Sequence, residues 1–361
     1  MIILYLIVLV ILSVYSYALI DPNLTLFNLP IWAQFREYMV HVGYYQRDIS
    51  WYIYFTIILF LFAFHLFFVK NYKRFSPVKI ILFSSIILLV SYPFLSHDFF
   101  NYLFDAKILT YYHQNPYLHR ALDFPGDPWL RFLHWTHRTY PYGPSFLVLT
   151  VIPSAIGMGK FIMHYFLLKL TFLFLFILSI YLISKKNRKW AMILATNPLI
   201  IMEGMVMMHN DLVGLALSLI GIYFLLDKNQ IPGRILLLIS AGIKYITFFP
   251  IFITKNMKLN AVLFALTLGL IAYATTRLGI QPWYFITLFV FVPFFDDFIM
   301  RLNIFFFALL VCYYPFIRIS DWGTQSNVDL KNMIIYTGII LNIIYLLFHY
   351  LMKSRKAFLT R

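Results

Sequence analysis

Long apolar runs separated by short polar segments dominate this chain. A membrane-spanning helix needs about 20 apolar residues, because it rises about 1.5 Å per residue across about 30 Å of hydrocarbon. The pattern therefore predicts an all-α polytopic integral membrane protein with about twelve transmembrane helices, in a single membrane domain over residues 1–361. The predicted spans are residues 2–20, 51–69, 80–96, 146–158, 161–183, 191–208, 211–227, 234–253, 259–278, 284–300, 303–319 and 333–352.

Composition agrees with a membrane location. Hydrophobic residues make up 62% of the chain and charged residues 12%, with a mean hydropathy of +0.79, which a soluble domain of this size could not keep in solution. The formal charge of +15 does not indicate nucleic-acid binding, because lysines and arginines stand mostly at the ends of apolar runs, facing anionic headgroups. The one cysteine, Cys312, excludes a disulfide framework and a cysteine-based metal site within this chain.

The basic residues between the second and third runs predict the orientation. Short cytoplasmic loops are rich in lysine and arginine, so this group places the N-terminus inside and residues 97–145 outside. The first run lacks a basic n-region and a small-residue cleavage site, so we expect a retained helix. A second basic group would then fall outside, so either the short run 146–158 is re-entrant and the later assignments reverse, or the rule is broken there. The two groups are Lys70, Lys73, Arg74 and Lys79, and Lys185, Lys186, Arg188 and Lys189.

Residues 21–50 form another predicted exterior segment. Trp32, Phe35, Tyr38 and Met39 are spaced as the apolar face of an amphipathic helix that lies in the membrane interface. A plain surface-lying connector is the alternative interpretation.

Most of the candidate chemistry lies in the exterior segment 97–145. It holds five of the ten histidines and four of the fourteen acidic residues of the chain. A polar segment of this length is too long for a simple connector, and long ordered loops tend to be functional. We therefore expect an exterior catalytic loop with interfacial amphipathic helices; a solvated cap is the alternative.

Asp98 is the first candidate for a catalytic role. It directly follows an apolar run, so its carboxylate should lie at the membrane surface, where partial desolvation can raise its basicity. If residues 97–107 are helical, Asp98, Asn101 and Asp105 share one helix face. An aspartate oriented by such neighbours suits a general base that deprotonates a sugar hydroxyl.

Two further groups in this segment could bind a lipid-linked sugar. The aromatic residues around Asn115-Pro116-Tyr117 could stack on sugar rings or sit in the headgroup belt. Arg131, His134 and Arg138 are spaced as a cationic helix stripe, which suits a lipid phosphate or pyrophosphate and equally suits ordinary phospholipid headgroups.

Metal binding is a competing interpretation of the histidines. His97 with Asp98, or His209 with Asp211, could join carboxylates around a divalent ion, but neither pair belongs to a closed ligand set. We predict no obligatory cofactor and no metal site, with a divalent metal as the alternative.

Several short motifs follow one another along residues 90–250, and their order and spacing are more specific than any one of them. They are Asp98 with Tyr102, Asn115-Pro116-Tyr117, Tyr140-Pro141-Tyr142-Gly143-Pro144, Glu203-Gly204 with His209-Asn210-Asp211, and Gly242-Ile243-Lys244 followed by Pro250. This combination resembles the polyprenyl-phosphate-sugar-dependent mannosyltransferases of the multi-span, C-type glycosyltransferase superfamily.

The resemblance implies a reaction and roles for the site residues. A polyprenyl-phosphate-linked sugar donor would enter from the bilayer, and a glycan, glycolipid or protein acceptor would be glycosylated on the exterior face of the cell membrane, with inversion. Asp98 matches the acidic residue of the first large exterior loop that is the presumed catalytic base. The departing phosphate would be stabilised by Lys244, Arg138, His209 and His97. The sugar and acceptor would contact Asn101, Tyr102, Asp105, Tyr117, Tyr142, Glu203, Asn210 and Asp211.

Two features of this predicted site depend on topology. Lys244 interrupts an apolar run, where an unpaired ammonium is costly, so it needs a lipid phosphate, Glu203 or Asp211 as its partner. Residues 209–211 fall on the cytoplasmic side in the simple count of spans, away from Asp98. A re-entrant run at 146–158 or a break at Asn197-Pro198 would remove this conflict.

Two other functions stay open from the sequence. Many spans with intramembrane Glu203 and Lys244 also suit a transporter or flippase of an amphiphilic anionic substrate, although the two halves show no repeat and the large exterior loop is asymmetric. A non-catalytic partner in polysaccharide assembly is the third. Counterflow of a lipid-linked sugar without acceptor product would favour transport, and a reaction by the purified chain alone would exclude the third.

Overall fold

The computed structural model describes residues 1–319, 321 and 323–359, with side chains described as far as residue 352. These residues form helices and connecting segments, with no strand among them, which confirms the all-α prediction. The α-helices are α1 (Ile2–Tyr15), α2 (Pro30–Val40), α3 (Arg47–Lys70), α4 (Pro77–Leu88), α5 (Asp98–Thr110), α6 (Pro144–Gly157), α7 (Phe161–Lys186), α8 (Arg188–Thr196), α9 (Asp211–Leu226), α10 (Gln230–Ala241), α11 (Met257–Leu278), α12 (Val292–Met300), α13 (Asn303–Val311) and α14 (Gln325–Leu359). Short 3-10 or π turns include η1 (Ser16–Leu19), η3 (Ala121–Asp123), η4 (Pro128–Phe132), η5 (Ile200–Val206) and η8 (Pro282–Phe291).

The prediction of about twelve membrane spans is wrong. Among the described residues, 6 helices are long and apolar enough to cross a bilayer, or 7 if η5 and α9, which meet at a bend of 107°, count as one broken span. Each of the six coincides with a predicted run, and the chain is a multi-pass membrane protein. The six are Ile2–Leu19, Arg47–Lys70, Phe161–Lys186, Met257–Leu278, Pro282–Met300 and Gln325–Met352.

The remaining apolar runs are shorter helices because prolines and polar residues interrupt them. In the run 191–208, α8 ends at Thr196 and Asn197 is extended, since the residue before Pro198 disfavours the helical region. In the run 80–96, α4 ends at Leu88, and the buried residues 91–95 have no regular secondary structure. Mean hydropathy does not register such breaks, because the residues on both sides of each break are apolar.

A buried lysine satisfies the broken end of α4. Lys169 of α7 is fully buried, and its Nζ donates hydrogen bonds to the carbonyl oxygens of Leu88, at 3.3 Å, and of Ser91. The Tyr165 hydroxyl donates to the same Ser91 oxygen at 3.0 Å. Backbone carbonyls that leave a helix within a membrane need such partners, so the break is built into the packing.

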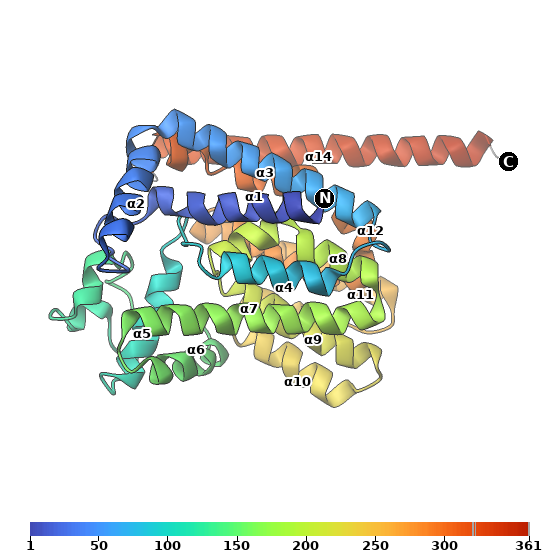
Figure 1. The fold of residues 1–361 in the computed structure, drawn as a ribbon. Coiled ribbons are helices and arrows are strands. Elements are labelled where there is room, and N and C mark those ends of the chain that lie inside the picture. The colour runs from blue at the N-terminus through green and yellow to red at the C-terminus, as the bar shows by residue number, and fades with distance from the viewer. Residues whose placement is uncertain (320, 322, 360–361) are drawn as a thin grey trace.

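The long helices α1, α3, α4 and α7 run roughly parallel, and α14 lies beside them and extends beyond the bundle (Figure 1). Helices α2, α5 and α6 gather at one end, together with the segment between α5 and α6 (Figure 1). This arrangement separates one end of the bundle, rich in short polar segments, from the apolar bundle itself.

The two basic groups lie together at the other end of the bundle. The Arg188 guanidinium Nε donates a hydrogen bond to the carbonyl oxygen of Phe75, which stands within the first group, at 3.1 Å. Of the two alternatives that the sequence left open, the structure therefore favours a run 146–158 that does not cross the membrane, with both basic groups on one side. The reason is α6, which stays at the end where α5 lies and does not cross, so that α7 returns to the side on which α4 began (Figure 1).

The predicted helix in residues 21–50 is confirmed as α2. Trp32 and Phe35 pack against the Tyr17 ring, with ring centroids 5.3 and 5.6 Å apart, and Met39 is buried, whereas Tyr38 is 67% exposed. The helix therefore has one apolar face against η1, and its place in a membrane interface stays a prediction.

The segment 97–145 is more ordered and more buried than a loop with interfacial helices. Helix α5 begins at Asp98, as the spacing of Asp98, Asn101 and Asp105 predicts, but residues 99–108 are all buried. A buried ion pair between Lys107 and Asp127, with the Lys107 ammonium 3.9 Å from the Trp129 ring centroid, holds the rest of the segment against α5. The predicted cationic helix stripe is wrong, because no regular helix follows η4 within residues 133–143.

Candidate active site

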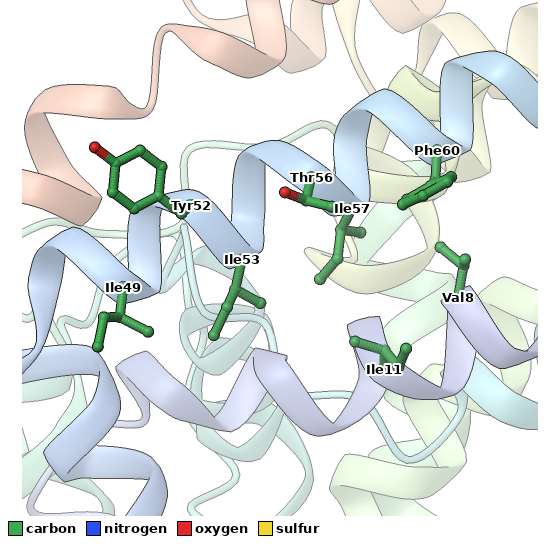
Figure 2. Close-up of a pocket in the computed structure, with 8 residues that line it drawn as sticks. All are labelled: Val8, Ile11, Ile49, Tyr52, Ile53, Thr56, Ile57 and Phe60. Atoms are coloured by element: carbon green, nitrogen blue, oxygen red, sulfur yellow. The ribbon is translucent and has the colours of Figure 1, made fainter.

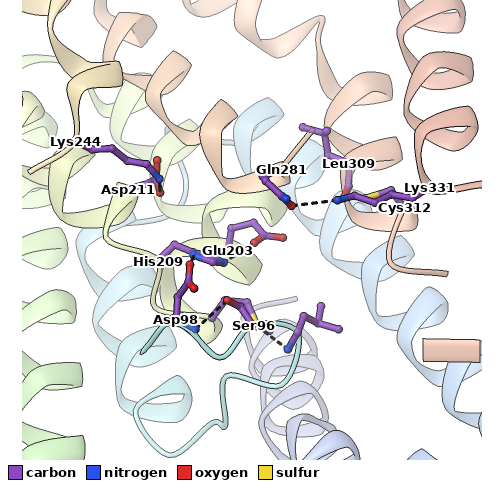
Figure 3. A network of polar contacts seen from close by, with 12 residues as sticks. Ser96, Asp98, Glu203, His209, Asp211, Lys244, Gln281, Leu309, Cys312 and Lys331 are labelled. Carbon is purple, nitrogen blue, oxygen red and sulfur yellow. Dashed lines mark hydrogen bonds and ion pairs between the residues drawn. The ribbon is translucent and has the colours of Figure 1, made fainter. Parts of the chain in front are cut away.

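Asp98 and His209 come together at the polar end of the bundle. The nearest Asp98 carboxylate oxygen lies 3.7 Å from Nδ1 of His209, and the Asp98 side chain is 19% exposed (Figure 3). The Asp98 backbone N–H donates to the Ser96 hydroxyl at 3.3 Å, which fixes the first turn of α5. The topological conflict raised by the sequence is thereby removed, since α6 does not cross the bundle.

His209 lies between two carboxyl groups. Its Nε2 is 3.5 Å from the Glu203 carboxylate, and its ring stacks on Trp283 with centroids 4.0 Å apart and planes at 17°. The preceding residue, Met208, has a φ of 58°, in the left-handed region that non-glycine residues rarely adopt. This turn sends the imidazole back between η5 and α9, toward Asp98.

Lys244 pairs with Asp211, one of the partners that the sequence suggested for it. Their charged atoms are 2.6 Å apart (Figure 3). The ammonium also lies 4.8 Å from the Tyr284 ring centroid. The Asp211 side chain is 1% exposed and that of Lys244 is 13% exposed. The Lys244 side chain is therefore partly exposed, while the buried carboxylate compensates its charge.

Arg138 brings a second positive charge to the start of α5. Its guanidinium is 3.4 Å from the Tyr142 hydroxyl and 5.5 Å from the Tyr142 ring centroid. Burial raises the pKa of Asp98, and the positive charges of Arg138 and Lys244 oppose this shift. Burial also raises the pKa of Asp105 to about 7, with Arg138 opposing and Asp98 reinforcing the shift.

The other predicted residues of α5 line this region from the side of the segment 97–145. Asn101 donates from Nδ2 to the Trp135 carbonyl oxygen at 3.2 Å. The Tyr102 ring packs edge-to-face against Tyr142, with centroids 5.1 Å apart. The Tyr117 hydroxyl donates to the Tyr142 carbonyl oxygen at 3.1 Å, so two of the motifs are in direct contact.

Two glycines join the Tyr140–Pro144 motif to the Lys244 motif. The Gly143 backbone N–H donates to the Ile243 carbonyl oxygen at 3.4 Å. A Cβ on Gly143 would lie 2.0 Å from the Gly242 carbonyl oxygen, and a Cβ on Gly242 would lie 2.3 Å from the Ser145 hydroxyl. Only glycine permits this approach, which places Lys244 relative to the segment that carries Arg138 and Tyr142.

His97 does not join the cluster around His209. Its ring stacks on His134, with centroids 3.5 Å apart, and its Nε2 faces the carboxylate of Asp21 at 3.7 Å. His97 therefore does not face the region between Lys244 and Arg138, where the donor phosphate was predicted to bind.

Three contributors to the site were missed by sequence reasoning. Trp283 stacks on the His209 ring, and Tyr284 lies beside the Lys244 ammonium. Lys331, from α14, donates from Nζ to Gln281 at 3.1 Å, and its positive charge acts on Glu203 (Figure 3). In the sequence, the only indication of a role for Lys331 is its position at the start of an apolar run.

An apolar groove of about 380 Å³ lies between α1 and α3 (Figure 2). Its walls include Val8, Ile11, Ile53 and Phe60, and none of its lining residues belongs to the cluster around His209. Both helices are candidate membrane spans, so the groove faces the hydrocarbon of the bilayer.

The fold and the site together define a class of protein. A multi-pass helical membrane protein, with a carboxylate, an imidazole and two cations gathered at one end of the bundle, has the features of a membrane glycosyltransferase. A family model described as alpha-(1->6)-mannopyranosyltransferase, N-terminal domain, matches residues 14–259, and the chain belongs to this mannosyltransferase family, which uses polyprenyl-phosphate-mannose. No curated protein and no solved structure matches the chain. The matched stretch includes every motif on which the resemblance rested.

Proposed function

We propose that this enzyme transfers mannose from a polyprenyl-phosphate-linked donor to a hydroxyl of a glycan or glycolipid acceptor, with inversion and with formation of an α-(1→6) linkage. The linkage is that of the family description. The reaction takes place at the end of the bundle that carries Asp98, on the exterior face of the membrane. The two basic groups at the opposite end support this orientation.

One observation carries the proposal: unpaired polar atoms converge beside Asp98 and Lys244. Among the described residues, buried side-chain atoms without a hydrogen-bond partner include Asn101 Oδ1, both polar atoms of Asn210, Asp211 Oδ1 and both ring nitrogens of His209. Buried polar groups are normally hydrogen-bonded, so a cluster of unpaired ones indicates a ligand rich in hydroxyls. A sugar with several hydroxyl groups satisfies such a cluster.

In the proposed reaction, the carboxylate of Asp98 accepts the proton of the acceptor hydroxyl. The acceptor oxygen forms a bond to the anomeric carbon, while the bond from that carbon to the phosphate oxygen breaks. The polyprenyl phosphate leaves with the electron pair of this bond. His209, which faces both Asp98 and Glu203, positions the base.

Negative charge grows on the departing phosphate, so fixed cations lower the barrier. Lys244 and Arg138 supply them, with His209 as a further contact. Bound sugar contacts Asn101, Asp105, Glu203, Asn210 and Asp211, whereas Tyr102, Tyr117 and Tyr142 form the aromatic wall. No step of this reaction requires a metal or another cofactor.

Transfer of labelled mannose by the purified chain tests the role of Asp98. We expect Asp98→Asn to lower the transfer rate by about 10²-fold or more, because the amide cannot accept the proton. Asp123→Asn is the matched control, since Asp123 is an exposed aspartate of the same segment that contacts only His119 and Arg120 among the described ion pairs. Equal rates for Asp98→Asn and wild type would exclude Asp98 as the base.

The single cysteine makes the orientation testable. Cys312 is buried, so a membrane-impermeant maleimide should react only with an introduced cysteine. Leu118 is 73% exposed at the proposed exterior end, and Arg74 is exposed at the opposite end. Labelling of intact cells should modify Leu118→Cys and spare Arg74→Cys, and the reverse pattern would place the active site on the cytoplasmic face.

A further inference from the structure

Three potential ligands meet outside the transfer site, from three separate parts of the chain. Asp21 follows the first membrane span, His97 immediately precedes α5, and His134 follows η4. One Asp21 carboxylate oxygen lies 3.7 Å from Nε2 of His97 and 3.6 Å from Nε2 of His134. Within the described part of the chain, this is the one group of three or more His, Cys, Asp or Glu whose ligand atoms all lie within 4.8 Å of one another.

These contacts are too long for ordinary hydrogen bonds and close to the spacing of metal ligands. N–H···O bonds span about 2.7–3.2 Å. Ligands of a tetrahedral zinc ion, each about 2.0–2.1 Å from the metal, lie about 3.3 Å apart. The Nε2 atom of His97 is buried and has no hydrogen-bond partner among the described residues. A buried nitrogen without a hydrogen-bond partner, directed at the same carboxylate oxygen as a second imidazole, indicates a shared ion.

We propose that Asp21, His97 and His134 bind one divalent transition-metal ion, and Zn²⁺ matches the ligands best. Two imidazoles and one carboxylate favour zinc or a similar first-row metal over Mg²⁺ and Ca²⁺, which prefer oxygen ligands. A water molecule completes the coordination, because the protein supplies three ligands. The two rings are stacked, so one of them must rotate for both nitrogens to bind one ion. His134 is the ring that can rotate, because it lies on an irregular segment and its side chain is 50% exposed.

The surroundings orient the carboxylate for this role. The second Asp21 oxygen accepts a hydrogen bond from the Asn23 backbone N–H at 2.7 Å, which leaves the first oxygen free for the ion. The Asp21 backbone N–H donates to the buried Tyr92 hydroxyl at 3.2 Å. Such outer contacts fix the orientation of metal ligands.

The proposed ion has a structural role and takes no part in the transfer chemistry. The ion would tie the end of the first span and the segment after η4 to the residue just before Asp98. It thus holds the N-terminus of α5 in place without contacting His209 or Lys244. A metal here is consequently a structural element of the polar end of the bundle.

Metal content of the full-length chain tests the site. The protein is purified without a polyhistidine tag, stripped with a chelator, incubated with ZnSO₄ and desalted, and its zinc is measured by mass spectrometry. We expect about one ion per chain in the wild type and a substoichiometric amount in His134→Ala. His137→Ala is the matched control, because His137 is exposed in the same segment, and it should retain the wild-type amount.

Two further measurements separate metal binding from a folding defect. Zn²⁺ should raise the thermal midpoint of the wild type and of His137→Ala but not that of His134→Ala. Co²⁺ should give a visible absorption band that Asp21→Asn and His134→Ala each weaken. Equal zinc in the wild type and His134→Ala, or a wild type that retains no zinc, would overturn the proposal. Because these readouts measure the ion and not mannose transfer, they test the metal site independently of the proposed reaction.

Discussion

The carboxylate of Asp98 and the imidazole of His209 lie 3.7 Å apart, although they come from the first turn of α5 and from the turn that precedes α9. Because His209 also faces Glu203 and stacks on Trp283, its ring cannot turn away from Asp98 without losing these contacts. The proposed base therefore has a fixed partner.

Replacement of His209 by glutamine should lower the turnover of mannose transfer by about 10²-fold, because the imidazole beside the base is lost while the polarity of the site is kept. The measurement is kcat with a polyprenyl-phosphate-linked mannose donor. His137→Gln changes an exposed histidine of the segment 97–145 and should retain wild-type turnover. A His209→Gln enzyme with turnover within about twofold of wild type would contradict the role of His209.

Replacement of Lys244 by methionine should affect both stability and donor binding. The loss of the ammonium leaves the Asp211 carboxylate buried and unpaired, which typically costs about 3–5 kcal/mol. The double variant Asp211→Asn/Lys244→Met removes both charges and should recover most of the thermal stability. Its KM for the lipid-linked donor should stay raised, since the cation that faces the phosphate is missing.

Lys255→Met provides the control for this series, because Lys255 is an exposed cation outside the cluster. Its thermal midpoint and its KM should equal those of the wild type. Recovery of the donor KM in the double variant would show that Lys244 acts only as the partner of Asp211.

Replacement of Gly143 by alanine should separate two motifs of the site. The new Cβ would lie 2.0 Å from the Gly242 carbonyl oxygen, so the backbone must shift at a cost of about 1–3 kcal/mol. We expect a lower thermal midpoint and reduced transfer, because the shift displaces Lys244 from Arg138. Gly126→Ala, where a Cβ meets nothing within 4 Å, should change stability by less than about 0.5 kcal/mol. Equal thermal midpoints for the two variants would contradict the packing argument.

Asp105 should make stability depend on pH. Burial raises its pKa in the folded protein to about 7, above that of an exposed aspartate, so the folded state binds the proton more tightly. The resulting stabilisation is fully present at acidic pH, below the pKa of the unfolded chain, and is lost as the pH rises to about 7, with a slope of at most about 1.4 kcal/mol per pH unit.

Thermal midpoints measured from pH 5 to pH 8 test this expectation. The wild type should lose stability with rising pH relative to Asp105→Asn, which cannot ionise at this position. Asp123→Asn, at an exposed position of the same segment, should follow the wild-type curve. Parallel curves for wild type and Asp105→Asn would show that Asp105 is ionised throughout this range.

The sequence by itself determined the class of the protein and much of the content of its site. The twelve apolar runs include all six helices that can span a membrane, because apolar length is a property of each segment. The order of the motifs around Asp98, His209 and Lys244 identified the family that the match over residues 14–259 shows. These conclusions needed no knowledge of how the segments face one another.

Only the tertiary structure decided which runs cross the membrane and which polar groups meet. Whether the run 146–158 crosses depends on its packing beside α5, and that choice put His209 on the side of Asp98. The pairing of Lys244 with Asp211, and of His97 with Asp21 rather than with Asp98, follows from the same choice. Hydropathy is a sum over neighbours in the chain, whereas an ion pair or a metal site depends on the direction in which distant segments place single atoms.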